Sequence, residues 1–121
     1  MLPKINRVKK KKDFETIFKK GASFKNNLLI LKIAKNNLKQ TRVGLVVSQK
    51  VSKKATVRNK IRRRLSEAIK IYIKDLTLGA QAKSGLDLVL IVLPGAAKSN
   101  FLETKSSLNN VLGKAKLIKN V

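Results

Sequence analysis

The sequence predicts an α+β fold, an α-β sandwich in which helices cover one small sheet. Apolar residues recur at helical spacing in three segments and form strand-like runs between them, in the order α-β-β-(β)-α-β-α. The chain has 121 residues, 43% of them hydrophobic, which suffices for one domain with a single modest core. We therefore treat residues 1–121 as one domain.

A basic segment, residues 1–12, precedes the first helix and is either a solvated tail or an arm that binds nucleic acid. The first helix is predicted to begin at Asp13, a capping residue, and to end at Gly21 in a left-handed conformation. Its apolar stripe consists of Phe14, Ile17 and Phe18. The stripe must pack on the rest of the protein, because a helix of two turns is not stable alone.

Three strands are predicted after this helix. Residues 28–34 and 42–48 surround a short polar loop, a pattern that predicts an antiparallel hairpin. Residues 49–56 form a basic connection with room for one more short strand. Residues 87–93 are a continuous apolar run typical of a buried strand, and Pro94-Gly95 ends it.

Two further helices complete the prediction. A long helix runs from about Val57 to Lys74. Its expected buried stripe is Ile61, Leu65, Ala68, Ile69 and Tyr72. The last helix begins at Asn100, where Glu103 three residues later indicates a capping box. Its expected buried residues are Phe101, Leu108, Val111, Leu112 and Ala115.

The charge of the chain is extreme, with 29 Lys and Arg against 6 Asp and Glu and a formal net charge of +23. Self-repulsion at this charge destabilises the compact state unless a polyanion neutralises it. Nucleic acid is the favoured polyanion, and an anionic membrane surface and acidic proteins are the alternatives. The longest apolar run is far shorter than the roughly 20 residues of a membrane helix, so we expect no membrane partner.

The segment Arg58 to Arg64 carries five positive side chains and the amide of Asn59 in seven residues. Planar guanidinium groups match phosphate oxygens bidentately, and Asn59 adds a directional donor and acceptor. Arg58 and Arg62 are four apart, as are Lys60 and Arg64, so these side chains must project to the flanks of the helix. The segment therefore predicts a surface for folded RNA.

Residues for catalysis are scarce. The chain contains no Cys and no His, which excludes zinc fingers, thiol nucleophiles and disulfides and fits a reducing, cytoplasmic location. Its six carboxylates are scattered, and Asp13 and Glu15 are expected to complement the dipole of the first helix. Phe14 and Phe18 are either core residues or platforms on which unpaired bases stack. We expect another molecule to supply any chemistry.

The segment Ala55 to Leu65, with Arg58-Asn59-Lys60 at its centre, resembles the signature helix of the bacterial ribonuclease P protein component. Residues 13–21, 42–51 and 87–92 are similar, in the same order, to that family's opening helix, its strand with a basic turn, and its last strand. The resemblance covers nearly the whole chain.

The resemblance implies a fold and a function. The fold is an α-β sandwich with a left-handed βαβ crossover around the Arg-rich helix, opposite to the general rule. The function is to partner a large catalytic RNA, as a monomeric subunit of the ribonucleoprotein endonuclease that removes the 5′ leader from precursor tRNA. The RNA supplies the chemistry and holds most of the Mg²⁺, and no catalytic or metal-binding residue is expected in the protein.

The resemblance also assigns residues. Those implied to contact the catalytic RNA are Arg58, Asn59, Lys60, Arg62 and Arg63. Those implied to line a groove for the single-stranded leader are Phe14, Phe18, Ser48 and Lys50, with Lys53 and Lys54 extending its basic rim.

The chain departs from the family pattern at several positions. Lys60 replaces the second Arg of an Arg-Asn-Arg motif and loses one guanidinium fork. Ser66 and Gln49 stand where basic residues are usual. Lys32 stands where relatives often carry an aromatic residue, and Leu93-Pro94 where many carry two basic residues, so leader contacts from those strands are not implied.

Two other functions are the alternatives; the composition fits the first equally well, whereas the missing acid–base residues count against the second. One is a structural protein of the ribosome or nucleoid, which copurifying ribosomal RNA or genomic DNA would indicate. The other is a stand-alone nuclease that uses Asp13 or Glu15 with a metal, which cleavage of precursor tRNA by the protein without RNA would indicate.

Overall fold

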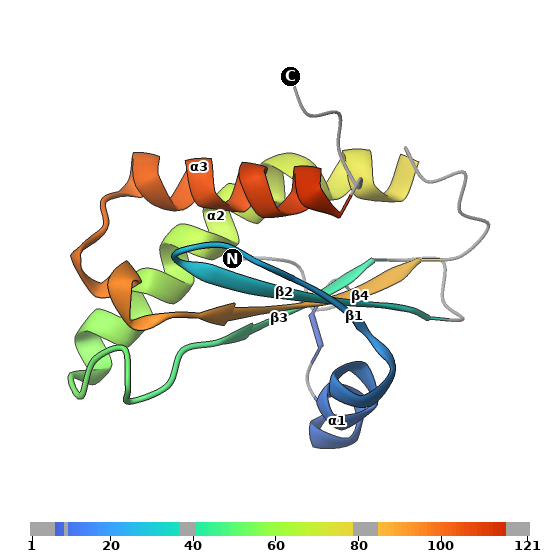
Figure 1. Ribbon diagram of the computed structural model, residues 1–121, viewed down its shortest axis with the longest axis horizontal. Helices are drawn as coiled ribbons and strands as arrows, with labels where there is room; N and C mark the ends of the chain where they lie inside the picture. The colour runs from blue at the N-terminus through green and yellow to red at the C-terminus, as the bar shows by residue number, and fades with distance from the viewer. Residues whose placement is uncertain (1–6, 9, 37–40, 79–84, 116–121) are drawn as a thin grey trace.

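A four-stranded sheet in the order β1-β2-β4-β3 forms the middle layer of the protein, with helices on both of its faces (Figure 1). The computed structural model describes residues 7–8, 10–36, 41–78 and 85–115. Its elements are α1 (Lys11–Lys20), β1 (Ala22–Lys25), β2 (Leu29–Lys35), β3 (Arg42–Val46), α2 (Ala55–Leu78), β4 (Leu86–Val92), the 3-10 helix η2 (Pro94–Lys98) and α3 (Phe101–Lys114). The α+β class and the predicted order of elements are confirmed.

Strand β4 lies between β2 and β3, antiparallel to the first and parallel to the second. The predicted hairpin of residues 28–34 with 42–48 is therefore wrong. The reason is the composition of β4, in which Leu88, Val89 and Leu90 are completely buried. A strand that is apolar on both faces is stabilised most in the middle of the sheet, where layers cover it from both sides.

The additional strand is β1, which pairs antiparallel with β2. The side-chain oxygen of Asn26 accepts hydrogen bonds from the backbone N–H groups of Leu28 (3.0 Å) and Leu29 (2.9 Å), which fixes the turn between these strands. The short strand that residues 49–56 could have contained is not formed. The chain turns there instead, because the N–H of Val51 bonds the carbonyl of Ser48 at 3.1 Å.

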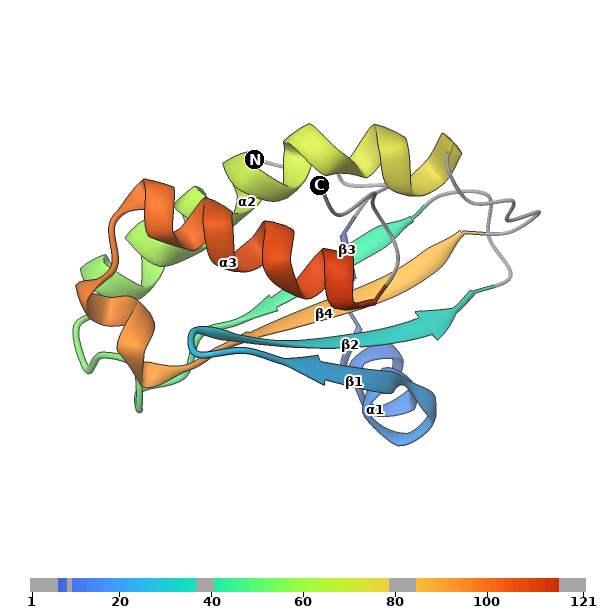
Figure 2. The ribbon, with the colours of Figure 1, turned by 45° about the horizontal axis from the view of Figure 1, so that its top comes forward.

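The connection from β3 through α2 to β4 is left-handed (Figure 2). Seen from the side of α2 with both strands pointing upward, β4 lies to the left of β3. Right-handed crossovers are nearly universal in such units, so this feature could not be predicted from general rules. It confirms the hand that the family resemblance implies.

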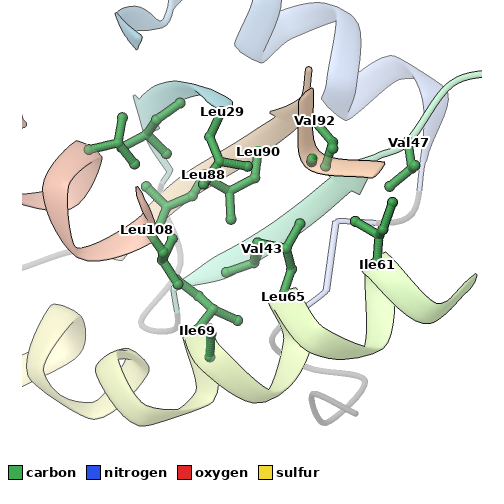
Figure 3. Packing of buried hydrophobic residues seen from close by; sticks show 14 of the residues in the cluster. Leu29, Val43, Val47, Ile61, Leu65, Ile69, Leu88, Leu90, Val92 and Leu108 are labelled. Carbon is green, nitrogen blue, oxygen red and sulfur yellow. The ribbon is translucent and has the colours of Figure 1, made fainter. Parts of the chain in front are cut away.

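Helices α2 and α3 cover one face of the sheet and enclose the main core (Figure 3). The predicted stripe of α2 is buried from Ile61 to Ile69, and Tyr72 packs against it half-buried. The capping box of α3 is confirmed, because the N–H of Glu103 bonds the side-chain oxygen of Asn100 at 2.8 Å. Phe101 was wrongly expected in the core and is 37% exposed, while Ala96 of η2 is buried at this end of the sheet.

Helix α1 alone among the described elements covers the opposite face (Figure 1). It begins at Lys11, so Asp13 lies in its first turn and does not cap it. Gly21 ends the helix in an extended conformation, which corrects the left-handed prediction. Glycine is needed because a Cβ atom there would lie 2.5 Å from the carbonyl oxygen of Ile17 and 2.9 Å from that of Ile33.

Candidate nucleic-acid interface

The first half of α2 carries a cationic ridge, defined as Arg58, Asn59, Lys60, Arg62, Arg63 and Arg64. Ile61 and Leu65 are buried beneath it and fix its orientation on the sheet. The guanidinium of Arg62 reaches the carbonyl of Val47 beyond β3 at 3.4 Å, and that of Arg64 reaches the carbonyl of Ser99 before α3 at 2.9 Å. The predicted projection to both flanks of the helix is thus observed.

Three of the four arginines of the ridge, Arg58, Arg62 and Arg64, are held by neutral oxygen atoms. Arg58 donates to the carbonyls of Ser52 (2.9 Å) and Lys53 (3.0 Å), and Arg62 donates to the side-chain oxygen of Asn59 (2.9 Å). In the described part of the chain, no carboxylate lies at ion-pair distance from a ridge cation. These bonds orient the guanidinium groups and leave their positive charge uncompensated, as a phosphate-binding surface requires.

Arg42 on β3 has the opposite environment. It donates two hydrogen bonds to the carboxylate of Asp87, at 2.8 and 2.7 Å, and a longer one to Asp13 of α1 at 3.3 Å. The hydrogen bond to Asp87 is the main cause that raises the pKa of Arg42, and both aspartate charges add to it against the effect of burial. Asn36 donates to the same carboxylate at 2.7 Å.

This ion cluster of Arg42, Asp13, Asp87 and Asn36 ties α1 to the sheet. Asp13 therefore forms a structural ion pair with Arg42 in addition to complementing the dipole of α1. Sequence reasoning missed the cluster because its members are distant in the chain, and the lone Asp87 at the start of an apolar strand was the available signal. Among the described residues, no group of three potential metal ligands comes together.

The two aromatic residues of α1 differ in how far they are buried. Phe14 is half-buried, and a Cβ atom on Gly44 would lie 2.5 Å from its ring, so glycine allows the ring to rest on the β3 backbone. Phe18 is 41% exposed, and its ring centroid is 6.5 Å from that of Phe14. Phe14 thus combines packing with exposure, whereas Phe18 is largely available to a ligand.

The other predicted leader residues lie in the segment between β3 and α2. Ser48 and Lys50 follow β3, and Lys53 and Lys54 precede α2 in a loop that descends beside this face (Figure 1). All four side chains are exposed. The segment that carries them thus extends toward the side of the sheet that α1 covers, at the other end of the sheet (Figure 1).

The sheet between these two groups has a partly open surface that sequence reasoning did not identify. Strand alternation puts Ile30, Lys32, Val46 and Ile91 on the side of α1, and each of them is half-buried. We call these four residues, with Phe14 and Phe18, the α1 face. It offers apolar area and a cation on one surface.

Known proteins match the chain over almost all of its length. The family model described as Ribonuclease P matches residues 2–116. The chain belongs to the ribonuclease P protein family. It is 39% identical to a ribonuclease P protein component of Pseudanabaena sp., over 98% of this chain and 97% of that one. It is 36% identical to the corresponding component of Clostridium botulinum, over 93% and 96%.

Solved structures agree with this assignment. The RNase P protein of Staphylococcus aureus superimposes with a TM-score of 0.79 at 31% identity, covering 93% of this chain and 96% of that one. The protein from Thermotoga maritima superimposes with a TM-score of 0.74 at 28% identity, covering 94% and 98%. The chain is thus a subunit of a ribonucleoprotein endoribonuclease in tRNA processing. No helix described here has the length and hydrophobicity needed to cross a bilayer.

Proposed function

We propose that the cationic ridge docks on the catalytic RNA of ribonuclease P and that the α1 face receives the single-stranded 5′ leader of precursor tRNA. The observation that carries the proposal is that Arg58, Arg62 and Arg64 pair, among the described residues, with neutral oxygens alone. If these arginines served the stability of the fold, we would expect them to pair with carboxylates, as Arg42 does in this protein.

The α1 face suits an unpaired strand. Phe14 and Phe18 can stack bases without sequence preference, at about 1–3 kcal/mol per base. Lys32 lies on the face itself, and the exposed Ser48, Lys50, Lys53 and Lys54 extend positive and polar character along its far end. A duplex would not expose base faces to such a surface, so the single-stranded leader fits it better than the tRNA body.

The division of labour follows from what the chain contains. With no His in the sequence and Asp13 engaged by Arg42, we assign bond cleavage to the catalytic RNA and its Mg²⁺ ions. The protein then acts as a monomeric, cytoplasmic subunit that raises the affinity for substrate.

A cleavage assay at low Mg²⁺ tests this proposal. Precursor tRNA is incubated with the catalytic RNA alone, with the protein alone, and with both. Cleavage should be efficient with both, weak with RNA alone and absent with protein alone. Binding to the assembled enzyme should favour precursor over mature tRNA by at least about fivefold, because each stacked base contributes about 1–3 kcal/mol. Cleavage by the protein alone, or equal binding of both tRNAs, contradicts the proposal.

A further inference from the structure

A small cavity lies where the ridge helix, the edge of β3 and α1 meet. Its volume is about 160 Å³. Phe14, Gly44 and Leu45 form part of its wall, Arg62 and Ser66 reach it from α2, and Arg7 completes the rim. A cavity of about 150 Å³ with apolar walls holds one benzene molecule, so this one has room for a single aromatic ring system.

Two polar sites at the cavity have no hydrogen-bond partner among the described residues, the hydroxyl of Ser66 and the backbone of Leu45. Ser66 is 5% exposed, and no residue of the described chain forms a hydrogen bond with its hydroxyl. Val43 and Val47 turn their carbonyls to the outer edge of β3, where they accept bonds from Val8 (3.0 Å) and Arg62 (3.4 Å). Leu45 lies between them and presents its N–H and C=O on the same edge, without a hydrogen-bond partner among the described residues.

The charge of the rim selects the kind of ligand. Arg62 uses two of its five donors for neutral oxygens, and no described residue that lines the cavity carries a carboxylate. A planar ring in the cavity, hydrogen-bonding groups at its edge and a phosphate against the arginines together describe one nucleotide. An aliphatic ligand would leave the Ser66 hydroxyl and the Arg62 guanidinium unmatched, and a small anion alone would leave the apolar walls of the cavity uncovered.

We propose that this cavity receives one unpaired nucleobase of the catalytic RNA, which inserts as the RNA docks on the ridge. The proposal rests on the proposed function of the ridge. It assigns the base to the catalytic RNA because Arg58, Arg62 and Ser66 follow one another at four-residue spacing along one flank of α2. The RNA that lies on the two arginines therefore passes the mouth of the cavity.

Filling the cavity tests the insertion while leaving every cation in place. Ser66→Leu occupies the space, and Ser66→Ala removes the hydroxyl but keeps the space, as a matched control. Catalytic RNA is probed with base-specific and backbone-specific reagents in the presence of each protein. Wild type and Ser66→Ala should protect one unpaired base that Ser66→Leu leaves reactive, while all three protect the same backbone. The affinity of Ser66→Leu should fall about 5- to 100-fold, the value of one stacked base, and that of Ser66→Ala less than about threefold.

Each other outcome has a defined meaning. Identical base protection by Ser66→Leu and wild type overturns the insertion. A Ser66-dependent base in the leader of precursor tRNA overturns its assignment to the catalytic RNA. If wild type protects no backbone of the catalytic RNA, the proposed function of the ridge fails instead.

A second measurement does not depend on a folded variant. Adenosine and cytidine 5′-monophosphate are titrated into the wild-type protein while backbone amide resonances are recorded. Saturable shifts at Leu45 and Ser66 are expected at roughly millimolar nucleotide, as a binding free energy near −4 kcal/mol implies. Absence of shifts at both amides at about ten times that concentration overturns the proposal.

Discussion

In the ridge, Arg58, Arg62 and Arg64 donate to carbonyl and amide oxygens, whereas Arg42 on β3 donates to two carboxylates. The side chains are chemically identical, and all four are partly buried. Their acceptors decide what they can do. A guanidinium oriented by neutral oxygens keeps its charge for a phosphate, and one enclosed by aspartates serves as an internal cross-link.

The difference shows that the basic residues behind the net charge of +23 do not all have the same function. Two of the six acidic residues converge on Arg42 and fasten α1, which carries the aromatic part of the α1 face. The ridge, in contrast, is fastened by its apolar underside. Stability and RNA binding should therefore respond to different substitutions.

The largest effect is expected from Asp87→Ala, which leaves Arg42 partly buried without its bidentate partner. Removing one member of such a pair costs about 3–5 kcal/mol, and we expect a loss of that order in the free energy of unfolding. Urea unfolding followed by circular dichroism measures it. Glu15→Ala on the exposed side of α1 is the control and should change stability by less than about 0.5 kcal/mol. A loss below about 1 kcal/mol for Asp87→Ala would mean that the cluster does not hold the fold.

The next largest effect should fall on leader binding. Phe18→Ala is expected to weaken binding of the leader by about 1–3 kcal/mol, because an exposed stacking platform is lost, with little change in stability. Phe14→Ala should weaken the same binding and also destabilise the fold, because its ring rests on Gly44. Affinities for precursor and mature tRNA, measured on the assembled enzyme, separate the two effects. Equal leader affinity for Phe18→Ala and wild type would remove Phe18 from the interface.

The sequence was sufficient to predict the ridge, because helical spacing alone requires Arg58 and Arg62 to flank a stripe that contains Ile61 and Leu65. It was also sufficient for the capping box of α3, which is a local pattern. It could not predict the neighbours of β4, since strand pairing depends on contacts between distant segments, and the polar loop between β2 and β3 falsely suggested a hairpin. The four-residue strand β1 was too short to show periodicity.

The candidate site, like the fold, could be predicted from the sequence only where it depends on local patterns. Each assigned residue of the ridge lies where the helix pattern put it. Ile30, Val46 and Ile91 of the α1 face were missed, because a strand that is apolar on both sides does not reveal which side remains open. The cavity beside Ser66 depends on three elements that meet in the fold, and no local pattern indicates it.

A smaller effect on RNA affinity should distinguish the positive charges of the ridge from other positive charges on the surface. Arg63→Ala should lower the affinity for catalytic RNA and reduce the slope of log K against log salt by about 0.9, the share of one phosphate contact. Lys70→Ala, two turns further along the exposed side of α2, is the matched control. Both variants should unfold like wild type, since neither side chain is buried. Equal slopes for the two variants would show that the ridge is no more than part of a diffuse positive surface.

The smallest expected effect is a gain. Lys60 is exposed and has no partner among the described residues, so Lys60→Arg adds a guanidinium fork without disturbing a bond. Catalytic RNA should bind more tightly, by less than about 1.4 kcal/mol or tenfold, with an unchanged salt slope because the charge is the same. Titration at several salt concentrations distinguishes this from a change in charge. Weaker binding would mean that the ridge accommodates a point charge at this position and that its geometry, as well as its charge, is matched to the RNA.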